Sequence, residues 1–282
     1  MKTHRTILTL WLLAACVLLL STPPASASTL QDGVSTVSIE SSPTLGGLFT
    51  WSVGGIEVMP EQWFWFRVGN AAEQPLGIVG MATDSTFFAF PGPNIATWSY
   101  SASGIDFGVT AQLTDAEPTR SLNLVVSASN TSTSAVTLSI FHYMSFRLGA
   151  GSNQADINGN TVRQTGSGYT AEVSVAPFDS RLLGFEAAAV PYTLNRLGDG
   201  TSTDFGSTMD SASGDVSAAF EWQMQLPGKT GDATSSFQLS MNEHLTVPET
   251  QNPEPASAAL VLGALVAIFL PRRRSSHPPT RR

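Results

Sequence analysis

Residues 61–68 alternate between two kinds of side chain, and one of the two sets could bind sugar. Every second residue is charged or an indole: Glu61, Trp63, Trp65 and Arg67. In an extended strand these four side chains would share one face. Indole rings flanked by a carboxylate and a guanidinium suit the stacking of sugar rings. The segment therefore predicts a glycan-binding surface. The alternative is a strand buried on both faces, with the indoles in the core.

A second group of candidate ligands lies in residues 197–215, a segment rich in Gly, Ser, Thr and Asp. Its carboxylates belong to Asp199, Asp204, Asp210 and Asp215. Oxygen ligands on a loop suit Ca²⁺, but this spacing does not match an EF-hand. Residues 156–167 fail the same pattern, because Thr161 replaces the required Gly and Ser167 the required Glu. We expect solvated turn residues and no metal or other cofactor, with calcium binding as the alternative.

Local catalytic motifs are missing from the sequence. It contains no G-x-S-x-G, no H-E-x-x-H and no phosphate-binding glycine loop. The carboxylates that could form a glycosidase-type acid pair are those of Glu57, Glu61, Asp106 and Glu221. Such a pair needs a defined separation, which a sequence does not give. Whether the chain is an enzyme stays open, and a non-catalytic role is the expectation.

Two histidines fall in the body of the chain. His142 alternates with Ile140 and Met144, so we expect it to be a buried, hydrogen-bonded core residue. His244 follows Glu243 and is assigned to the polar face of its segment, where water would solvate it.

The elements that must position these residues are β-strands. Apolar residues recur at every second position in runs that include 105–113, 122–126, 136–146, 218–226 and 237–241. Apolar residues at every second position over such lengths are typical of strands with one face buried. The connectors 130–134 and 227–233 and the pair Gly54-Gly55 predict hairpins. No helical periodicity occurs between the two termini. The fold class is therefore all-β, as one large antiparallel β-sandwich over residues 28–247.

Charge is distributed unevenly along the chain. Residues 28–247 hold 20 acidic residues and seven cations, a net charge of −13, and the other cations lie near the termini. A domain this acidic repels phosphate backbones, so we expect no nucleic-acid partner. The single cysteine, Cys16, precedes the body, which therefore has no disulfide and no thiolate ligand.

Residues 1–27 have the layout of a secretory signal peptide. Basic residues precede an apolar run over 7–20, and small residues at 25 and 27 precede Ser28. We expect signal peptidase to cut between Ala27 and Ser28. The alternative is a lipoprotein box at residues 13–16, with Cys16 as the acylated residue, although an apolar run follows it.

A short apolar run, 256–270, lies near the other end of the sequence. As a helix of 15 residues it would measure about 22 Å, against a hydrocarbon core of about 30 Å. Leu270, Pro271 and the long side chain of Arg272 would complete the crossing. The arginines would stay on the cytoplasmic side and leave the acidic body outside. We therefore expect a single short transmembrane helix.

The C-terminal residues, about 247–282, resemble the PEP-CTERM sorting signal. The triplet Pro253-Glu254-Pro255 precedes the apolar run, and Arg272, Arg273 and Arg274 follow it. The resemblance implies that an exosortase, a membrane protease of Gram-negative bacteria, recognises the triplet, cuts near it and releases or transfers the body. Asn252 stands where the family often has Val, and residues 247–250 carry a partial copy of the motif. The cleavage position therefore stays open.

These features divide the chain into a signal peptide (1–27), a β-sandwich domain (28–247) and a sorting or anchor segment (248–282). We expect an exported protein that passes through the inner membrane and then reaches the cell surface, the extracellular matrix or a biofilm. Its expected partners are signal peptidase, an exosortase-type protease and extracellular polysaccharide. The alternatives are a carbohydrate-binding module, a sugar-active sandwich enzyme and a permanent single-span anchor.

Overall fold

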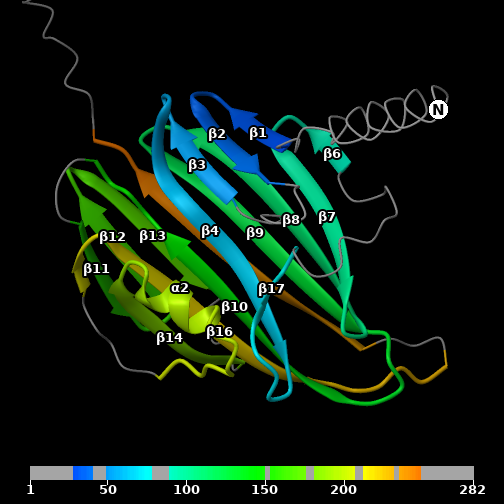
Figure 1. Cartoon of the computed structure of the whole chain (residues 1–282). Helices are drawn as coiled ribbons and strands as arrows, with labels where there is room; N and C mark the ends of the chain where they lie inside the picture. The colour runs from blue at the N-terminus through cyan, green and yellow to red at the C-terminus, as the bar shows by residue number, and fades with distance from the viewer. Residues whose placement is uncertain are drawn as a thin grey trace, which may run out of the picture. The chain divides into compact units, whose positions relative to one another are not determined.

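The computed structural model of the chain describes residues 28–40, 49–77, 89–149, 153–175, 181–206, 212–231 and 235–248. The chain divides into two compact units, Met1–Val247 and Pro248–Arg282, and both sheets lie in the first (Figure 1). No helix among the described residues is long and apolar enough to cross a membrane. The predicted signal peptide and the predicted apolar helix 256–270 lie outside the described residues.

The first sheet has eight antiparallel strands. Their order across the sheet is β1 (Ser28–Asp32), β2 (Ser35–Ile39), β3 (Phe49–Val53), β4 (Ile56–Val68), β10 (Val136–Ser145), β16 (Val216–Leu226) and β14 (Leu182–Ala189). The short strand β5 (Gln74–Pro75) also pairs with β4. The centre of this sheet is therefore formed by β4, β10 and β16, which come from distant parts of the sequence.

The second sheet has nine antiparallel strands. Their order is β15 (Ala212–Gly214), β11 (Asn153–Asn158), β12 (Thr161–Gly166), β13 (Tyr169–Val175), β17 (Ser235–Thr246), β9 (Thr119–Asn130), β8 (Ile105–Ala116), β7 (Ile95–Ala102) and β6 (Ala89–Gly92). The two sheets pack into a sandwich, so the prediction of an antiparallel β-sandwich is confirmed.

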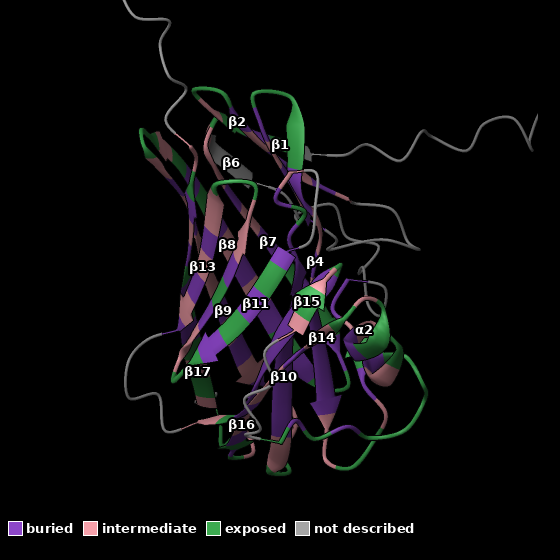
Figure 2. Cartoon of the chain, turned by 90° about the vertical axis from the view of Figure 1, so that its left-hand side faces the viewer, coloured by how far each residue is buried: buried purple, intermediate pink, exposed green. Residues whose placement is uncertain are grey.

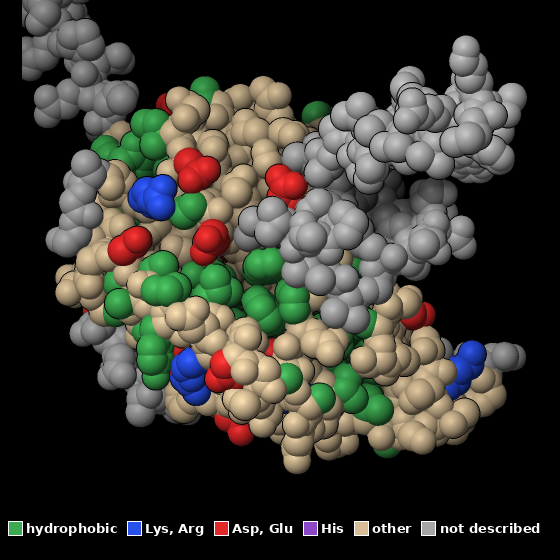
Figure 3. Space-filling view, in the orientation of Figure 1, with side chains coloured by type: hydrophobic (Ala, Val, Ile, Leu, Met, Phe, Trp, Pro, Cys, Tyr) green, Lys and Arg blue, Asp and Glu red, His purple; other side chains and the backbone are tan. Residues whose placement is uncertain are grey.

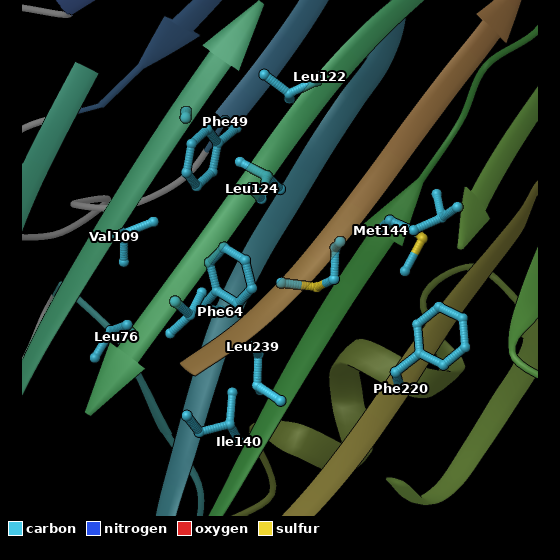
Figure 4. Close-up of a cluster of buried hydrophobic side chains, with 14 of the residues drawn as sticks. Phe49, Phe64, Leu76, Val109, Leu122, Leu124, Ile140, Met144, Phe220 and Leu239 are labelled. Atoms are coloured by element: carbon cyan, nitrogen blue, oxygen red, sulfur yellow. The ribbon is translucent and has the colours of Figure 1, made fainter. Parts of the chain in front are cut away.

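A continuous apolar core fills the space between the sheets (Figure 4). Phe49 of β3 and Trp98 of β7 meet across it with ring centroids 5.3 Å apart. Phe66 of β4 lies 4.9 Å from Phe107 of β8. The strand β8 buries every second residue from Ile105 to Leu113, as its alternation predicts. Because each fully buried aliphatic or aromatic side chain stabilises by about 1.5–3 kcal/mol, this interface holds the two sheets together.

Of the three predicted hairpins, one is confirmed and two are wrong. Gly54 and Gly55 turn β3 into β4 with φ values of 58° and 79°, a region in which glycine is unstrained. The connection after Asn130 leads instead from β9 in one sheet to β10 in the other. The connection after Leu226 leads from β16 to β17, which are likewise in different sheets. Alternation and connector length are similar for a hairpin and for a crossover between packed sheets, so the sequence did not separate the two.

The two crossovers lie against each other. The Asn130 Nδ2 donates to the carbonyl oxygens of Ser134 at 2.8 Å and of Pro227 at 3.0 Å. The backbone N–H of Lys229 donates to the Ser132 carbonyl at 2.7 Å. Gly228 lies so close to the Thr133 carbonyl that any Cβ would collide with it. One buried asparagine and one glycine therefore fix the end of the sandwich at which the chain changes sheet.

One helix in the body was not predicted. The helix α2 (Tyr192–Leu197) has six residues and precedes the segment 198–206. It contacts β14 and β16 on the eight-stranded sheet. The strand β10 is accordingly buried on both faces along most of its length, and Figure 2 shows it in the buried colour. Six residues are too few to display helical periodicity, so the sequence carried no clear signal for this element.

Candidate functional site

The four residues of the predicted glycan-binding surface lie on β4, on the face that points away from the second sheet. In register, Trp65 is opposite Phe141 of β10, which in turn is opposite Glu221 of β16. The helix α2 and the segment 198–206 cover this face and form a small second core. Its members are Trp65, Phe141, Tyr143, Leu197, Phe205 and Ala219, with Trp63 and Leu194 at the edge.

The two indoles differ in exposure. Trp65 is buried, with 7% of its surface exposed, whereas Trp63 is half-buried. Their ring centroids lie 5.6 Å apart and the ring planes are inclined by 63°, so they do not form one flat platform. Beside Trp63, the Tyr143 hydroxyl donates to Glu61 Oε2 at 3.4 Å. A ligand on this face would therefore meet Glu61 and Trp63, while Trp65 supports the covering segment.

Arg67 is the centre of a buried ion cluster. Its guanidinium donates to Glu73 at 3.0 Å, to Asp204 at 2.6 Å and to Glu221 at 3.1 Å. It also donates to the Thr203 carbonyl oxygen at 2.6 Å and to Ser139 Oγ at 3.2 Å. Arg67, Glu73 and Glu221 are all buried. We call Arg67, Glu73, Asp204 and Glu221 the arginine cluster.

The arginine cluster ties the covering segment to the sheet. The backbone N–H of Thr203 donates to Glu73 at 2.7 Å, and that of Phe205 donates to Glu221 at 2.9 Å. Burial raises the pKa of Glu221 to about 7, against the opposing effects of the Phe205 N–H and Arg67. Glu221 is therefore a structural hydrogen-bond partner of Arg67. Because it is buried, a substrate could not reach its carboxylate.

The predicted calcium ligands are dispersed. Asp199 accepts hydrogen bonds from the backbone and hydroxyl of Thr201 in a local turn. Asp204 belongs to the arginine cluster, and Asp215 is an exposed residue just before β16. Asp210 lies outside the described residues. In the part of the chain that the structure describes, no three His, Cys, Asp or Glu side chains are grouped to hold a metal ion.

The other candidates for an acid pair are separated as well. Glu57 is exposed and lies 3.8 Å from Arg147. Asp106 accepts a hydrogen bond from Ser101 at 2.6 Å on the second sheet. Glu61 and Glu221 share the covered face of the first sheet, but only Glu61 is accessible there.

A polar cluster in the centre of the sandwich was not predicted from the sequence. His142 of β10, Gln62 of β4 and Glu243 of β17 are all completely buried. The Gln62 amide donates to Glu243 Oε1, and its Nε2 lies 2.5 Å from His142 Nε2. His142 Nε2 and Glu243 Oε1 are 3.4 Å apart. We call these three residues the interior cluster.

Burial suppresses charge in the interior cluster. It lowers the pKa of His142 to about 3 and raises the pKa of Glu243 to about 8. Near neutral pH both side chains are therefore uncharged. The prediction of a buried His142 is confirmed. The signal for Glu243 was present but overlooked, because Glu243 shares the inward phase of Met241 and Leu245. His244, which was assigned to water, is half-buried and lies 2.9 Å from Ser121 Oγ.

The predicted processing sites fall mostly outside the described residues. These are Ala27, Pro253, Glu254, Pro255, Arg272, Arg273 and Arg274. Ser28, the predicted first residue after signal cleavage, is the first residue of β1.

No protein-family model matches the sequence, and no curated protein matches it. Among solved structures, the Slr1438 protein from Synechocystis sp. PCC 6803 is similar with a TM-score of 0.50 and 11% identity, over 79% of this chain and 96% of that one. A galactose mutarotase-like protein from Lactobacillus casei has a TM-score of 0.47 and 10% identity, over 78% of this chain and all of that one. A bacterial glucoamylase complexed with acarbose has a TM-score of 0.48 and 9% identity, over 86% of this chain and 36% of that one. The likeness to the Slr1438 protein concerns the fold alone, and at 11% identity it says nothing about activity.

Proposed function

We propose that this chain is an exported β-sandwich protein of a Gram-negative bacterium, sorted by an exosortase-type protease and acting at the cell surface or in the extracellular matrix. The observation that carries the proposal is the order of three features near the C-terminus: the triplet Pro253-Glu254-Pro255, an apolar run and three arginines. The two prolines deny this stretch a helical hydrogen-bond pattern, which would keep it extended for a protease.

The position of the folded part is compatible with both cleavages. The strand β1 begins at Ser28, so a cut after Ala27 would leave it complete. The strand β17 ends at Thr246, and the compact unit that contains both sheets ends at Val247. A cut near Pro253 would therefore remove no described strand.

On the described surface charges are dispersed (Figure 3), and the most buried carboxylates are committed to structural contacts. On the face drawn in Figure 3, charged side chains are dispersed among polar and apolar ones. The most buried carboxylates on the covered face, Glu73 and Glu221, are committed to Arg67. Glu61 has an approach from solvent, and its partner Tyr143 lies close enough to Asp215 for that second carboxylate also to raise the Tyr143 pKa.

The experiment is the mass of the mature protein recovered from cells and from the medium. Sorting gives a product that begins at Ser28 and lacks Arg272, Arg273 and Arg274. The variant Glu254→Ala should accumulate as a longer, membrane-bound form, because the recognised triplet is broken. A mature product that keeps the three arginines would instead identify a permanent single-span anchor, and intact chain in the cytosol would exclude export.

Carbohydrate binding is the second candidate function, and the half-buried Trp63 beside Glu61 favours it. Trp63→Ala should weaken retention on extracellular polysaccharide and leave the thermal midpoint nearly unchanged. The matched variant Trp65→Ala should lower stability by about 3–5 kcal/mol, since it empties a buried site under α2. A large loss of stability in Trp63→Ala, with polysaccharide retention unchanged, would assign this indole to the second core instead.

A further inference from the structure

Two carboxylates lie near the hydroxyl of Tyr143 on the outer face of the first sheet. The Tyr143 hydroxyl donates to Glu61 Oε2 at 3.4 Å. Burial raises the pKa of Tyr143, and the negative charges of Glu61 and Asp215 raise it further. Glu61 is half-buried and Asp215 is exposed. Both carboxylates are therefore close to one phenol, and solvent reaches both of them.

Strand register explains how these distant residues meet. Glu61 of β4 is opposite Ser145 of β10, which is opposite Ser217 of β16. Opposite residues point to the same face of a sheet, and neighbouring strands lie about 4.8 Å apart. Asp215 precedes Ser217 by two positions, and its backbone carbonyl accepts a hydrogen bond from the Val190 N–H at 2.8 Å. The two carboxylates therefore come from β4 and from the start of β16, the strands on either side of β10. We call Glu61 and Asp215 the carboxylate pair.

Cations near this face do not neutralise the carboxylate pair. Arg147, which follows β10, lies 3.8 Å from Glu57, and Arg196 of α2 is paired with Glu186. In the part of the chain that the structure describes, no salt bridge includes either member of the carboxylate pair. The pair also belongs to a domain with a net charge of −13. This face should therefore repel an anion and attract a cation.

Ser217 is a second, independent indication of a ligand. It is completely buried, and it lies on the outward row that starts at Glu61. Its hydroxyl is near that of Tyr143, but its Oγ makes no well-aligned hydrogen bond to any described residue. Buried hydroxyls are nearly always paired, because an unpaired one costs stability. The Ser217 oxygen therefore lacks a donor at the place where the carboxylate pair would hold a cation.

The aromatic side chain beside the carboxylate pair suits a sugar ring. Trp63 is opposite Tyr143 in register, and it is half-buried, so part of its indole is exposed. An indole binds the apolar side of a ring and also attracts a cation to its face. A ligand that matches all of these groups has a ring, hydroxyl groups and a positive charge.

We propose that the carboxylate pair, Ser217 and Trp63 bind a basic amino sugar unit, with its ammonium group held by Glu61 and Asp215. This binding mode rests on carbohydrate binding, the second candidate function, and adds the class of saccharide. An ammonium group donates three hydrogen bonds and accepts none, which matches two carboxylates and one hydroxyl oxygen. Acetylation of the amine removes the positive charge and leaves the sugar ring in place. An acetylated ligand therefore isolates the contribution of the carboxylate pair.

The test uses the full chain, purified in an uncharged detergent. Calorimetric titration at low ionic strength compares the trisaccharide of glucosamine with chitotriose, its N-acetylated counterpart. The glucosamine trisaccharide should bind at least about tenfold more tightly. The double variant Glu61→Gln and Asp215→Asn should abolish this preference and leave the affinity for chitotriose unchanged. Both replacements keep the size of the side chain, so the thermal midpoint should stay at the wild-type value.

The matched control makes the same two chemical changes on the second sheet. Asp156→Asn with Glu172→Gln, at outward positions of β11 and β13, should leave both affinities unchanged. The amino-sugar proposal is overturned if the double variant Glu61→Gln and Asp215→Asn keeps the preference. It is also overturned if the control loses the preference as fully, since the ligand would then respond only to the net charge of the domain.

Trp63→Ala separates the class of saccharide from carbohydrate binding itself. It should weaken the binding of both trisaccharides. If the wild type binds both equally well and Trp63→Ala weakens both, carbohydrate binding stands and the selection for a basic sugar is wrong. If neither trisaccharide binds at about 10 mM, the amino-sugar proposal fails. The retention of Trp63→Ala on polysaccharide then decides the candidate function separately.

Discussion

The arginine cluster and the interior cluster are both buried groups of ionisable residues, and they handle charge in opposite ways. In the arginine cluster a permanent cation meets three carboxylates, and one of these, Asp204, has 74% of its side-chain surface exposed. The interior cluster lies between the sheets, contains no arginine or lysine and is completely buried. Its carboxyl and imidazole groups are therefore held in their neutral forms.

The two clusters differ in how many hydrogen bonds they make, although the arginine cluster also keeps two buried atoms, Arg67 Nε and Glu73 Oε2, without a partner among the described residues. Arg67 donates to five different residues, including a backbone carbonyl of the covering segment. In the interior cluster each member keeps one polar atom without a partner among the described residues: Gln62 Oε1, His142 Nδ1 and Glu243 Oε2. A paired network fixes structure, whereas unsatisfied buried atoms cost stability. We conclude that the arginine cluster holds the covering segment in place, and that the interior cluster is retained against its own energetic cost.

The largest expected effect comes from breaking the arginine cluster. Arg67→Ala should lower the free energy of unfolding by about 3–5 kcal/mol, because Glu73 and Glu221 would remain buried without their cation. Urea unfolding measures the loss. Limited proteolysis should cut within 198–206, since the segment loses its attachments to Glu73 and Glu221.

A companion variant separates lost charge from lost volume. Replacing Arg67 with Met together with Glu73→Gln and Glu221→Gln removes the buried charges while keeping most of the packing. It should recover a large part of the stability that Arg67→Ala loses. An Arg67→Ala protein as stable as the wild type would show that the arginine cluster is dispensable.

The interior cluster predicts a stability maximum in mildly acidic solution. The folded-state pKa of Glu243 is raised to about 8, so the folded chain holds a proton that the unfolded chain releases above its ordinary pKa of 4.5. The contribution of Glu243 to the free energy of unfolding should therefore fall as the pH rises from about 4.5 to 8. The pKa of His142 is lowered from 6.5 to about 3, so its own contribution should fall as the pH drops from about 6.5 towards 3. The two contributions oppose each other between about pH 4.5 and 6.5, so the net stability should be greatest there and fall on either side.

The variant Glu243→Gln tests the alkaline half of that profile. It should remove most of the loss above about pH 6.5, on the order of a few kcal/mol, and leave only the His142 contribution to lower the stability below that pH. Part of the alkaline loss should persist through Glu221, whose pKa is raised to about 7. Glu57→Gln removes the same charge at an exposed position and should reproduce the wild-type profile. An identical profile for Glu243→Gln and wild type would contradict the assignment.

Removing the interior cluster altogether should be neutral or stabilising. The triple replacement Gln62→Leu, His142→Phe and Glu243→Leu substitutes apolar side chains for three buried polar groups. Similar replacements of buried ionic groups change stability by between zero and a gain of about 1–4 kcal/mol. Denaturant unfolding at neutral pH gives the comparison. A strongly destabilised triple variant would mean that the polar contacts contribute more than their desolvation costs.

The smallest effect is expected at an exposed ion pair. Arg163 and Glu172 lie 3.3 Å apart on the outer face of β12 and β13, with 57% and 43% of their side-chain surfaces exposed. Arg163→Ala should change the free energy of unfolding by less than about 1 kcal/mol. The difference between this loss and the loss in Arg67→Ala gives the free energy of unfolding that burial adds to an arginine–carboxylate contact.

Particular residues show why the sequence predicted one region better than another. The strand β8 has one face in the core and one in water, so its alternation alone identified both the strand and its buried side. The centre of the first sheet gave a misleading pattern, because Trp65 and Arg67 look like surface residues and are covered by a segment more than 130 positions away. Glu243 was overlooked because a charged residue at an inward position is rare.

The sequence by itself determined the class of fold and the inward phase of most strands, and the proposed processing signals also rest on it alone, since each of these depends on neighbouring residues. Only the tertiary structure decided where the chain changes sheet, that α2 covers the indoles, and which carboxylates meet Arg67. It also decided that Gln62, His142 and Glu243 meet inside the sandwich. These features depend on contacts between distant segments, and a linear pattern does not specify which segments will meet.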